Sequence, residues 1–243
     1  MKLAAVVPAF LLVAGGAAAQ ETAERVVARV FGAAITAADL RWGAGRPAVE
    51  AVQALRSRMQ KEATERFVAA NDVQATEQDF AAFEKFEAEF ARLERERRAA
   101  QKKKLETELA VPGLDAGKRT ALEQQREVLA SLERVDAERV ALQTDPQTRR
   151  RISGPWITGY KANRALYEKY GGRVGITKWG PEPVGAMEAL LREHERRGEF
   201  AILDAALAEE FWAWYAAQPR MAARPAEVDF TYYWLKPARA GNP

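Results

Sequence analysis

The chain has 243 residues, of which 48% are hydrophobic and 29% are charged. This balance is typical of a globular protein and not of a disordered one. Its 37 basic and 34 acidic residues nearly cancel, so charge gives no case for a dedicated nucleic-acid binder. The lack of cysteine and the single histidine exclude disulfides, thiolate catalysis, cysteine-ligated zinc and two-histidine mechanisms. We therefore expect no cofactor and no bound metal.

The first 19 residues have the order of a secretory signal peptide. A positive start at Lys2 is followed by an apolar run over residues 3–13 and by small residues up to Ala19. A transmembrane anchor is the alternative, but the run is short for a span of about 20 residues, and Pro8 interrupts it. We expect cleavage after Ala19, a periplasmic location and no stable membrane insertion.

The next segment predicts a small β element followed by helices. Residues 25–31 and 33–36 are rich in β-branched and small apolar residues around a glycine, which is typical of a hairpin. Thr36 and Asp39 have the spacing of a capping box, which predicts a short helix directly after the hairpin. A longer helix is predicted over residues 47–70 from its apolar periodicity.

Two long helices of similar length are predicted in the middle of the chain. Residues 77–110 begin with a second capping-box pair and carry nine acidic and eight basic residues, so this helix is exposed on most of its girth. Residues 111–113 stop it, and a partner helix covers residues 116–144. A short turn between matched helices predicts a long antiparallel helical hairpin arm.

The apolar seam of this hairpin is predicted from a heptad spacing. Its members are Phe83, Phe86, Phe90 and Leu93 on the first helix, and Leu122, Leu129, Leu132, Val135 and Val140 on the second. Beyond Leu93 the first helix offers Arg97, Ala100 and Lys104 at seam positions, so the tip is expected to be thinly packed.

Aromatic residues gather in the last part of the chain. All six tyrosines and five of the six tryptophans lie between Trp156 and Trp234. Helices are predicted over residues 147–170, 181–198 and 204–218, with a short strand within 173–179 and an aromatic tail over 225–243 that lies against the body. The aromatic residues are interpreted either as core and lid, or as a groove for an apolar peptide. The candidate peptide-binding residues are Phe83, Phe86, Phe90, Trp156, Tyr160 and Trp212.

No residue is predicted to be catalytic. His194 lies between two glutamates on a predicted helix and is interpreted as a surface histidine, because adjacent helix positions do not share a face. No serine lies in a G-x-S-x-G motif. The arginines at 149–151 could bind an anionic group, but such a run is typical of a solvated helix face. The glycines at 171–175 indicate a helix stop and a turn.

The predicted domain order has four parts. They are a signal peptide over 1–19, a strand–turn–helix body over 20–76, the helical hairpin arm over 77–145, and an aromatic-rich helical region over 146–243 that packs on the body. The predicted fold class is mainly α with a small β element.

The N-terminal body resembles that of SurA-type, parvulin-linked foldases. Residues 26–40, VVARVFGAAITAADL, are similar to the family's strand–turn–helix opening VVAxVNGxxITxxDL, and residues 71–80 are similar to its later turn and helix start. The resemblance covers residues 25–110. It implies a SurA-N-like exported chaperone domain that cradles unfolded envelope proteins. The family's parvulin domains carry a buried pair of histidines, whereas this chain has one histidine and no recognisable parvulin segment.

Three functions follow as hypotheses. The leading one is a periplasmic, cofactor-free holdase-type chaperone or assembly factor that binds apolar segments of unfolded or partly folded envelope proteins. The second is a structural or adaptor protein that binds one folded envelope partner through the helical arm. The third is a degenerate peptidyl-prolyl isomerase. The oligomeric state is left open.

Overall fold

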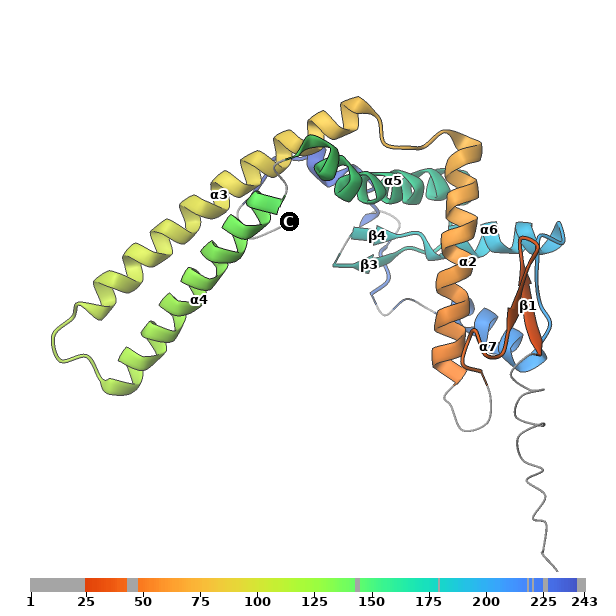
Figure 1. The fold of residues 1–243 in the computed structure, drawn as a ribbon, viewed down its shortest axis with the longest axis horizontal. Coiled ribbons are helices and arrows are strands. Elements are labelled where there is room, and N and C mark those ends of the chain that lie inside the picture. The colour runs from red at the N-terminus through yellow and green to blue at the C-terminus, as the bar shows by residue number, and fades with distance from the viewer. Residues whose placement is uncertain are drawn as a thin grey trace, which may run out of the picture. The chain divides into compact units, whose positions relative to one another are not determined.

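The computed structural model describes residues 25–42, 48–142, 145–178, 180–217, 219, 221–224 and 227–239. It confirms a mainly helical chain with a small antiparallel sheet (Figure 1). The chain divides into two compact units. Unit 1 combines Met1–Phe67 with Leu166–Ala226, and unit 2 combines Val68–Ala165 with Glu227–Pro243. The predicted signal peptide and its cleavage site lie outside the described residues.

Most predicted helices are present with slightly different bounds. The elements are β1 (Val26–Val30), β2 (Ala33–Thr36), α2 (Ala48–Asn71), α3 (Glu77–Leu109), α4 (Ala116–Leu142), α5 (Pro146–Tyr170), β3 (Gly175–Thr177), β4 (Gly180–Glu182), α6 (Val184–Arg196), β5 (Phe200–Ile202), α7 (Ala205–Ala216) and the 3₁₀ turn η2 (Tyr233–Leu235).

The sheet of unit 1 has the strand order β2-β1-β5, and both pairings are antiparallel. The predicted hairpin is confirmed: Val30 pairs with Ala33 across a turn in which Phe31 and Gly32 both have positive φ, 48° and 86°. Such a turn matches the twist of the two strands. On the other side Val30 pairs with Phe200 of β5. The core of unit 1 draws buried side chains from these strands and from α2, α6 and α7.

The short helix predicted after the hairpin is wrong. The capping-box contacts do form, because Thr36 and Asp39 exchange hydrogen bonds of 2.8–3.2 Å. The chain then makes only one turn, in which the Trp42 amide donates to the Ala37 carbonyl at 2.7 Å. Arg41 lies at φ 53°, a left-handed conformation that ends helical propagation. The Trp42 indole donates to Asp204 at 3.3 Å.

Arg173 organises the C-terminal part of unit 1. Its guanidinium donates to the carbonyls of Tyr215, Ala216 and Ala217, the last two at 2.8 and 2.9 Å, and to Glu188 at 2.7 Å. A cation on the last carbonyls of α7 also interacts favourably with the helix dipole. The glycine-rich stretch before it stops α5, as predicted, with positive φ at residues 171 and 172.

In unit 2, the α3–α4 helix pair packs in opposite directions around a short turn (Figure 1). Arg98 meets Asp136, and four residues further along α3 Lys102 lies 4.0 Å from Glu133. A complete capping box starts α3 at Thr76, and Lys161 of α5 donates to the Asp79 carboxylate of that box at 2.7 Å. The predicted start of this helix is therefore confirmed.

The predicted seam between α3 and α4 is largely wrong, because Phe83 and Phe86 pack on η2 and parts of the predicted α4 seam are exposed. On α3 the buried positions are Phe86, Arg98 and Leu105. On α4 Leu122 is buried, whereas Leu132 and Val135 are 46% and 53% exposed. The side chain of Val140 lies outside the described residues. A straight helix drifts by about 20° per heptad, so a strict seven-residue repeat loses the contact face along a long helix. Near the tip Leu105 and Leu122 are buried, while most of the surrounding residues of both helices are exposed.

Candidate functional site

The densest group of aromatic side chains lies in unit 2, where α3, α5 and the chain's tail meet. We call it the aromatic cluster; its members are Phe80, Phe83, Phe86, Phe90, Trp156, Tyr160, Tyr232, Tyr233 and Trp234. Its buried centre is formed by Phe86, Ile157 and Trp234. The tail, blue in Figure 1, reaches this point through η2, which packs on α3.

Helix α3 provides one wall of the cluster. Phe83, Phe86 and Phe90 are spaced by three and four residues, so they lie on one face of the helix. The rings of Phe86 and Phe90 stack at 6.2 Å between centroids. Tyr233 of the tail meets Phe86 edge to face at 5.2 Å, and Trp234 meets Phe83 at 5.8 Å. Aromatic pairs in such geometries gain about 0.5–1.5 kcal/mol beyond their burial.

Helix α5 provides the opposite wall. The Trp156 indole donates to the Tyr233 hydroxyl at 3.0 Å. Tyr160 contacts Tyr232, Tyr233 and Trp234 with centroid distances of 6.2, 5.8 and 5.5 Å. Burial raises the pKa of Tyr160, and it raises the pKa of Tyr233 to about 12. Burial therefore disfavours the phenolate form of both rings.

Most of the cluster is only half-buried. Phe86 and Trp234 are buried, while the other seven members keep part of their surface exposed. Leu235, directly after Trp234, is 59% exposed. Large aromatic side chains with a polar tip offer contact area at a low entropic cost, which is why they are enriched in binding surfaces. The arrangement can therefore bind apolar chain segments.

Charged groups surround the aromatic surface. Arg164 lies over the ring of Tyr232 at 5.4 Å, and Arg150 lies over Phe80 at 5.5 Å. Within the tail, Lys236 lies 2.7 Å from Asp229. The Lys236 contact, with hydrogen bonds from Thr231, lowers the pKa of Asp229 to about 2. This polar rim around an apolar centre resembles the anatomy of protein interfaces.

The structure brings five of the six predicted peptide-binding residues together. Phe83, Phe86, Phe90, Trp156 and Tyr160 all belong to the aromatic cluster. Trp212 lies in unit 1 instead, against Phe200 at 6.0 Å and under the guanidinium of Arg192 at 3.4 Å. Nothing in the sequence around Trp212 distinguishes it from the other five candidate residues. The aromatic tail also contributes to the cluster, although its residues are not among those predicted to bind a peptide.

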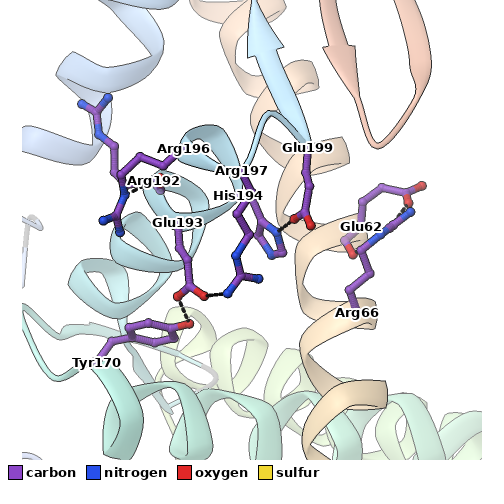
Figure 2. Close-up of polar contacts among 9 residues, drawn as sticks. All are labelled: Glu62, Arg66, Tyr170, Arg192, Glu193, His194, Arg196, Arg197 and Glu199. Atoms are coloured by element: carbon purple, nitrogen blue, oxygen red, sulfur yellow. Dashed lines mark hydrogen bonds and ion pairs between the residues drawn. The ribbon is translucent and has the colours of Figure 1, made fainter.

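The prediction that His194 lies on the surface is wrong. The residue is 7% exposed, and its ring meets Phe31 edge to face at 5.0 Å. Nδ1 contacts the Glu199 carboxylate, as Figure 2 shows, while Nε2 is buried without a hydrogen-bond partner. The pairing of β1 with β5 brings the hairpin turn next to the C-terminal end of α6. There the Phe31 amide donates to the Glu199 carbonyl at 2.7 Å. Such long-range pairing is not visible in the helix sequence.

Polar groups beside His194 are engaged with one another. The Tyr170 hydroxyl donates to Glu193 at 2.7 Å, and Arg197 contacts the same carboxylate (Figure 2). Burial and the Glu193 carboxylate raise the pKa of Tyr170 to about 12. Within the described ranges, no group of three or more histidine, aspartate or glutamate side chains is placed to hold a metal ion.

Two further observations concern membranes and anions. None of the described helices is long and apolar enough to cross a membrane. Arg150 pairs with Glu77 at 2.6 Å, and Arg149 lies 3.8 Å from Glu84. These arginines therefore form surface ion pairs of the kind expected for a solvated helix face.

The chain was compared with protein families, curated proteins and solved structures. No protein-family model, no curated protein and no solved structure matches the chain.

Proposed function

We propose that the protein is a holdase-type chaperone or assembly factor of the periplasm. It binds apolar segments of unfolded or partly folded envelope proteins on the rings that α3 and α5 contribute to the aromatic cluster, and it needs no cofactor. The observation that carries the proposal is the half-buried aromatic face of α3 and α5, against which the aromatic run of the tail packs. The N-terminal resemblance supports it, since a SurA-N-like body with a hairpin arm is built to cradle clients.

The cluster offers enough apolar surface for weak and promiscuous binding. An aromatic side chain buries about 150–250 Å² when fully covered. The partly buried rings keep at most about a third of that surface exposed, so covering one of them removes up to about 70 Å² from water and gains up to about 2 kcal/mol. Two or three such contacts gain about 4–6 kcal/mol before the cost of ordering the client, which leaves an affinity of about millimolar or weaker. Weak binding of this kind suits a chaperone that must release its clients.

The α3–α4 helix pair adds a second apolar surface, which we propose as part of the arm. Val128, Leu132 and Val135 of α4 are spaced by four and three residues, and all three are exposed. They form a stripe on one face of the helix. A client that contacts both the cluster and this stripe gains from multivalency, because the second contact is intramolecular.

The proposal is tested by suppression of client aggregation. A chemically unfolded envelope protein is diluted into buffer with the wild type, Phe83→Ala or Phe90→Ala, and aggregation is followed by light scattering. Both variants remove half-buried rings and leave the buried Phe86 in place. We expect each to require several-fold more protein for the same suppression.

The matched control is Trp214→Ala, which removes a 36% exposed aromatic ring from unit 1. Circular dichroism and the melting temperature must stay near wild type for each variant, since truncating a buried phenylalanine can cost about 3–5 kcal/mol. Equal loss of suppression in Phe83→Ala and Trp214→Ala, or no loss in either cluster variant, would contradict the proposal.

The α4 stripe is also the observation that favours the adaptor hypothesis. A helix face with exposed residues at i, i+4 and i+7 is a common way to dock on a folded partner. Stoichiometric co-purification of one folded envelope protein, lost in Leu132→Asp but kept in Phe83→Ala, would support the adaptor. A prolyl isomerase is less well supported, because His194 is buried beneath Phe31. Turnover of a prolyl peptide that disappears in His194→Ala would overturn this ranking.

A further inference from the structure

The tail of the chain completes the aromatic cluster in an unusual way. Residues 227–239 contribute three of its nine rings and insert Trp234, which is 4% exposed, next to Phe83 and Tyr160. The seat is formed by α3 on one side and α5 on the other. These two helices carry the rings that are proposed to bind clients. The tail therefore covers the surface that a client would use.

The tail has the chemistry of a bound peptide. Its central run, FTYYWL over 230–235, is an apolar aromatic segment of the kind that the proposed function binds. It also makes contacts within itself: Asp229 accepts hydrogen bonds from the Thr231 amide at 2.8 Å and from Lys236 at 2.7 Å, and the Leu235 amide donates to the Tyr232 carbonyl at 2.9 Å. A segment that holds its own shape loses less entropy on binding.

The fit of the tail in its seat is incomplete. The Trp234 indole nitrogen is buried and has no hydrogen-bond partner among the described residues. A buried donor without an acceptor is costly, and native cores rarely keep one. The contacts described from the tail to α3 and α5 are mainly ring to ring, with the Trp156–Tyr233 hydrogen bond as a polar exception. A seat of this kind holds the tail and also permits its exchange.

We infer that residues 227–239 act as a tethered pseudo-ligand that occupies the client surface in cis. An apolar client segment gains the rings of α3 and α5 by displacing the tail, and the tail returns when the client leaves. This inference rests on the proposed function and adds its regulation. The tether raises the effective concentration of the tail to the order of millimolar, so only clients that offer several contacts compete with it.

The test uses the whole chain with a specific protease site introduced at positions 225–226. A fluorescent synthetic peptide with the sequence of residues 227–239 is titrated into the uncleaved and the cleaved protein, and binding is followed by fluorescence anisotropy. Cleavage turns the tail from a tethered into a free competitor. We expect the peptide to bind the cleaved protein at least about tenfold more tightly than the uncleaved one.

A variant that keeps the fold provides the second arm. Tyr233→Phe removes the hydroxyl that accepts from Trp156 and weakens the tail without emptying its seat. We expect the uncleaved variant to bind the wild-type peptide several-fold more tightly than the uncleaved wild type does. The matched control is Tyr170→Phe in unit 1. This change likewise removes a hydrogen-bonded phenol hydroxyl, whose partner is the Glu193 carboxylate, and it should leave peptide binding unchanged.

Two results would overturn the inference. Equal affinity of the peptide for cleaved and uncleaved protein would place its binding site elsewhere. A cleaved tail that never exchanges, or whose release unfolds the protein, would make the tail a permanent core element. Either result leaves the proposed function standing if the wild type still suppresses aggregation and Phe83→Ala does not. If the wild type does not suppress aggregation, the proposed function fails whatever the peptide does.

Discussion

Neutralising Asp136 should cost the α3–α4 helix pair far more than neutralising Glu133, one turn earlier on the same helix. Asp136 pairs with Arg98, whose side chain lies on the inner face of α3 and is 8% exposed. The Nε atom of Arg98 is already buried without a partner. Glu133 pairs with Lys102 at 4.0 Å, and both of these side chains are about half exposed. Asp136 and Glu133 therefore differ in how deeply their cationic partners are buried.

The expected magnitudes follow from this difference. Removing one partner of a buried ion pair costs about 3–5 kcal/mol, because the remaining charge stays uncompensated. Asp136 keeps 35% of its side chain in contact with solvent, which reduces the expected cost of Asp136→Asn to about 1–3 kcal/mol. An exposed pair contributes at most about 1 kcal/mol, so Glu133→Gln should cost less than that. Both changes keep the side-chain shape.

Amide hydrogen exchange over α3 and α4 measures these costs, because exchange reports the free energy of local opening. A factor of ten in rate corresponds to about 1.4 kcal/mol. We expect exchange about 5- to 150-fold faster in Asp136→Asn, and less than about fivefold faster in Glu133→Gln. Joint replacement by Arg98→Met and Asp136→Leu should restore most of the protection, since an apolar pair needs no charge partner. Equal effects of the two single variants would refute the argument from burial.

Two further predictions test the packing of unit 1 and the tail. A Cβ at Gly185 would lie 2.4 Å from the backbone nitrogen of Arg173, so Gly185→Ala should lower the melting temperature by about 2–12 °C. The control Gly159→Ala, where no atom lies within 4 Å of the added Cβ, should raise the melting temperature slightly. Equal melting temperatures of the two variants would contradict this. Because the pKa of Asp229 falls from 3.8 to about 2, its stabilisation of the tail is present above about pH 4 and lost between pH 4 and 2. Tryptophan fluorescence should follow that loss, and Asp229→Asn should abolish its pH dependence.

Several features of this protein could be predicted from the sequence because they depend on neighbouring residues. The capping box at Thr76 forms as its spacing indicates, and the hairpin forms around Gly32. The glycines at 171 and 172 end α5. In each case the backbone conformation and the nearby hydrogen bonds decide the outcome within a few residues. The grouping of Phe83, Phe86 and Phe90 on one face also follows from helical periodicity alone.

Only the tertiary structure decided which faces meet. His194 has a polar neighbourhood in the sequence, yet the pairing of β1 with β5 buries it against Phe31. On α3, Arg98 meets Asp136 of α4, a charged pair that the heptad spacing does not indicate. Trp212 and Trp156 have equal claims in the sequence, but the fold places them in different units. Burial depends on contacts between residues that are far apart in the chain, and hydrophobic attraction is not directional. A local sequence pattern therefore indicates that a side chain can be buried. The packing of the whole fold determines which residue it is buried against.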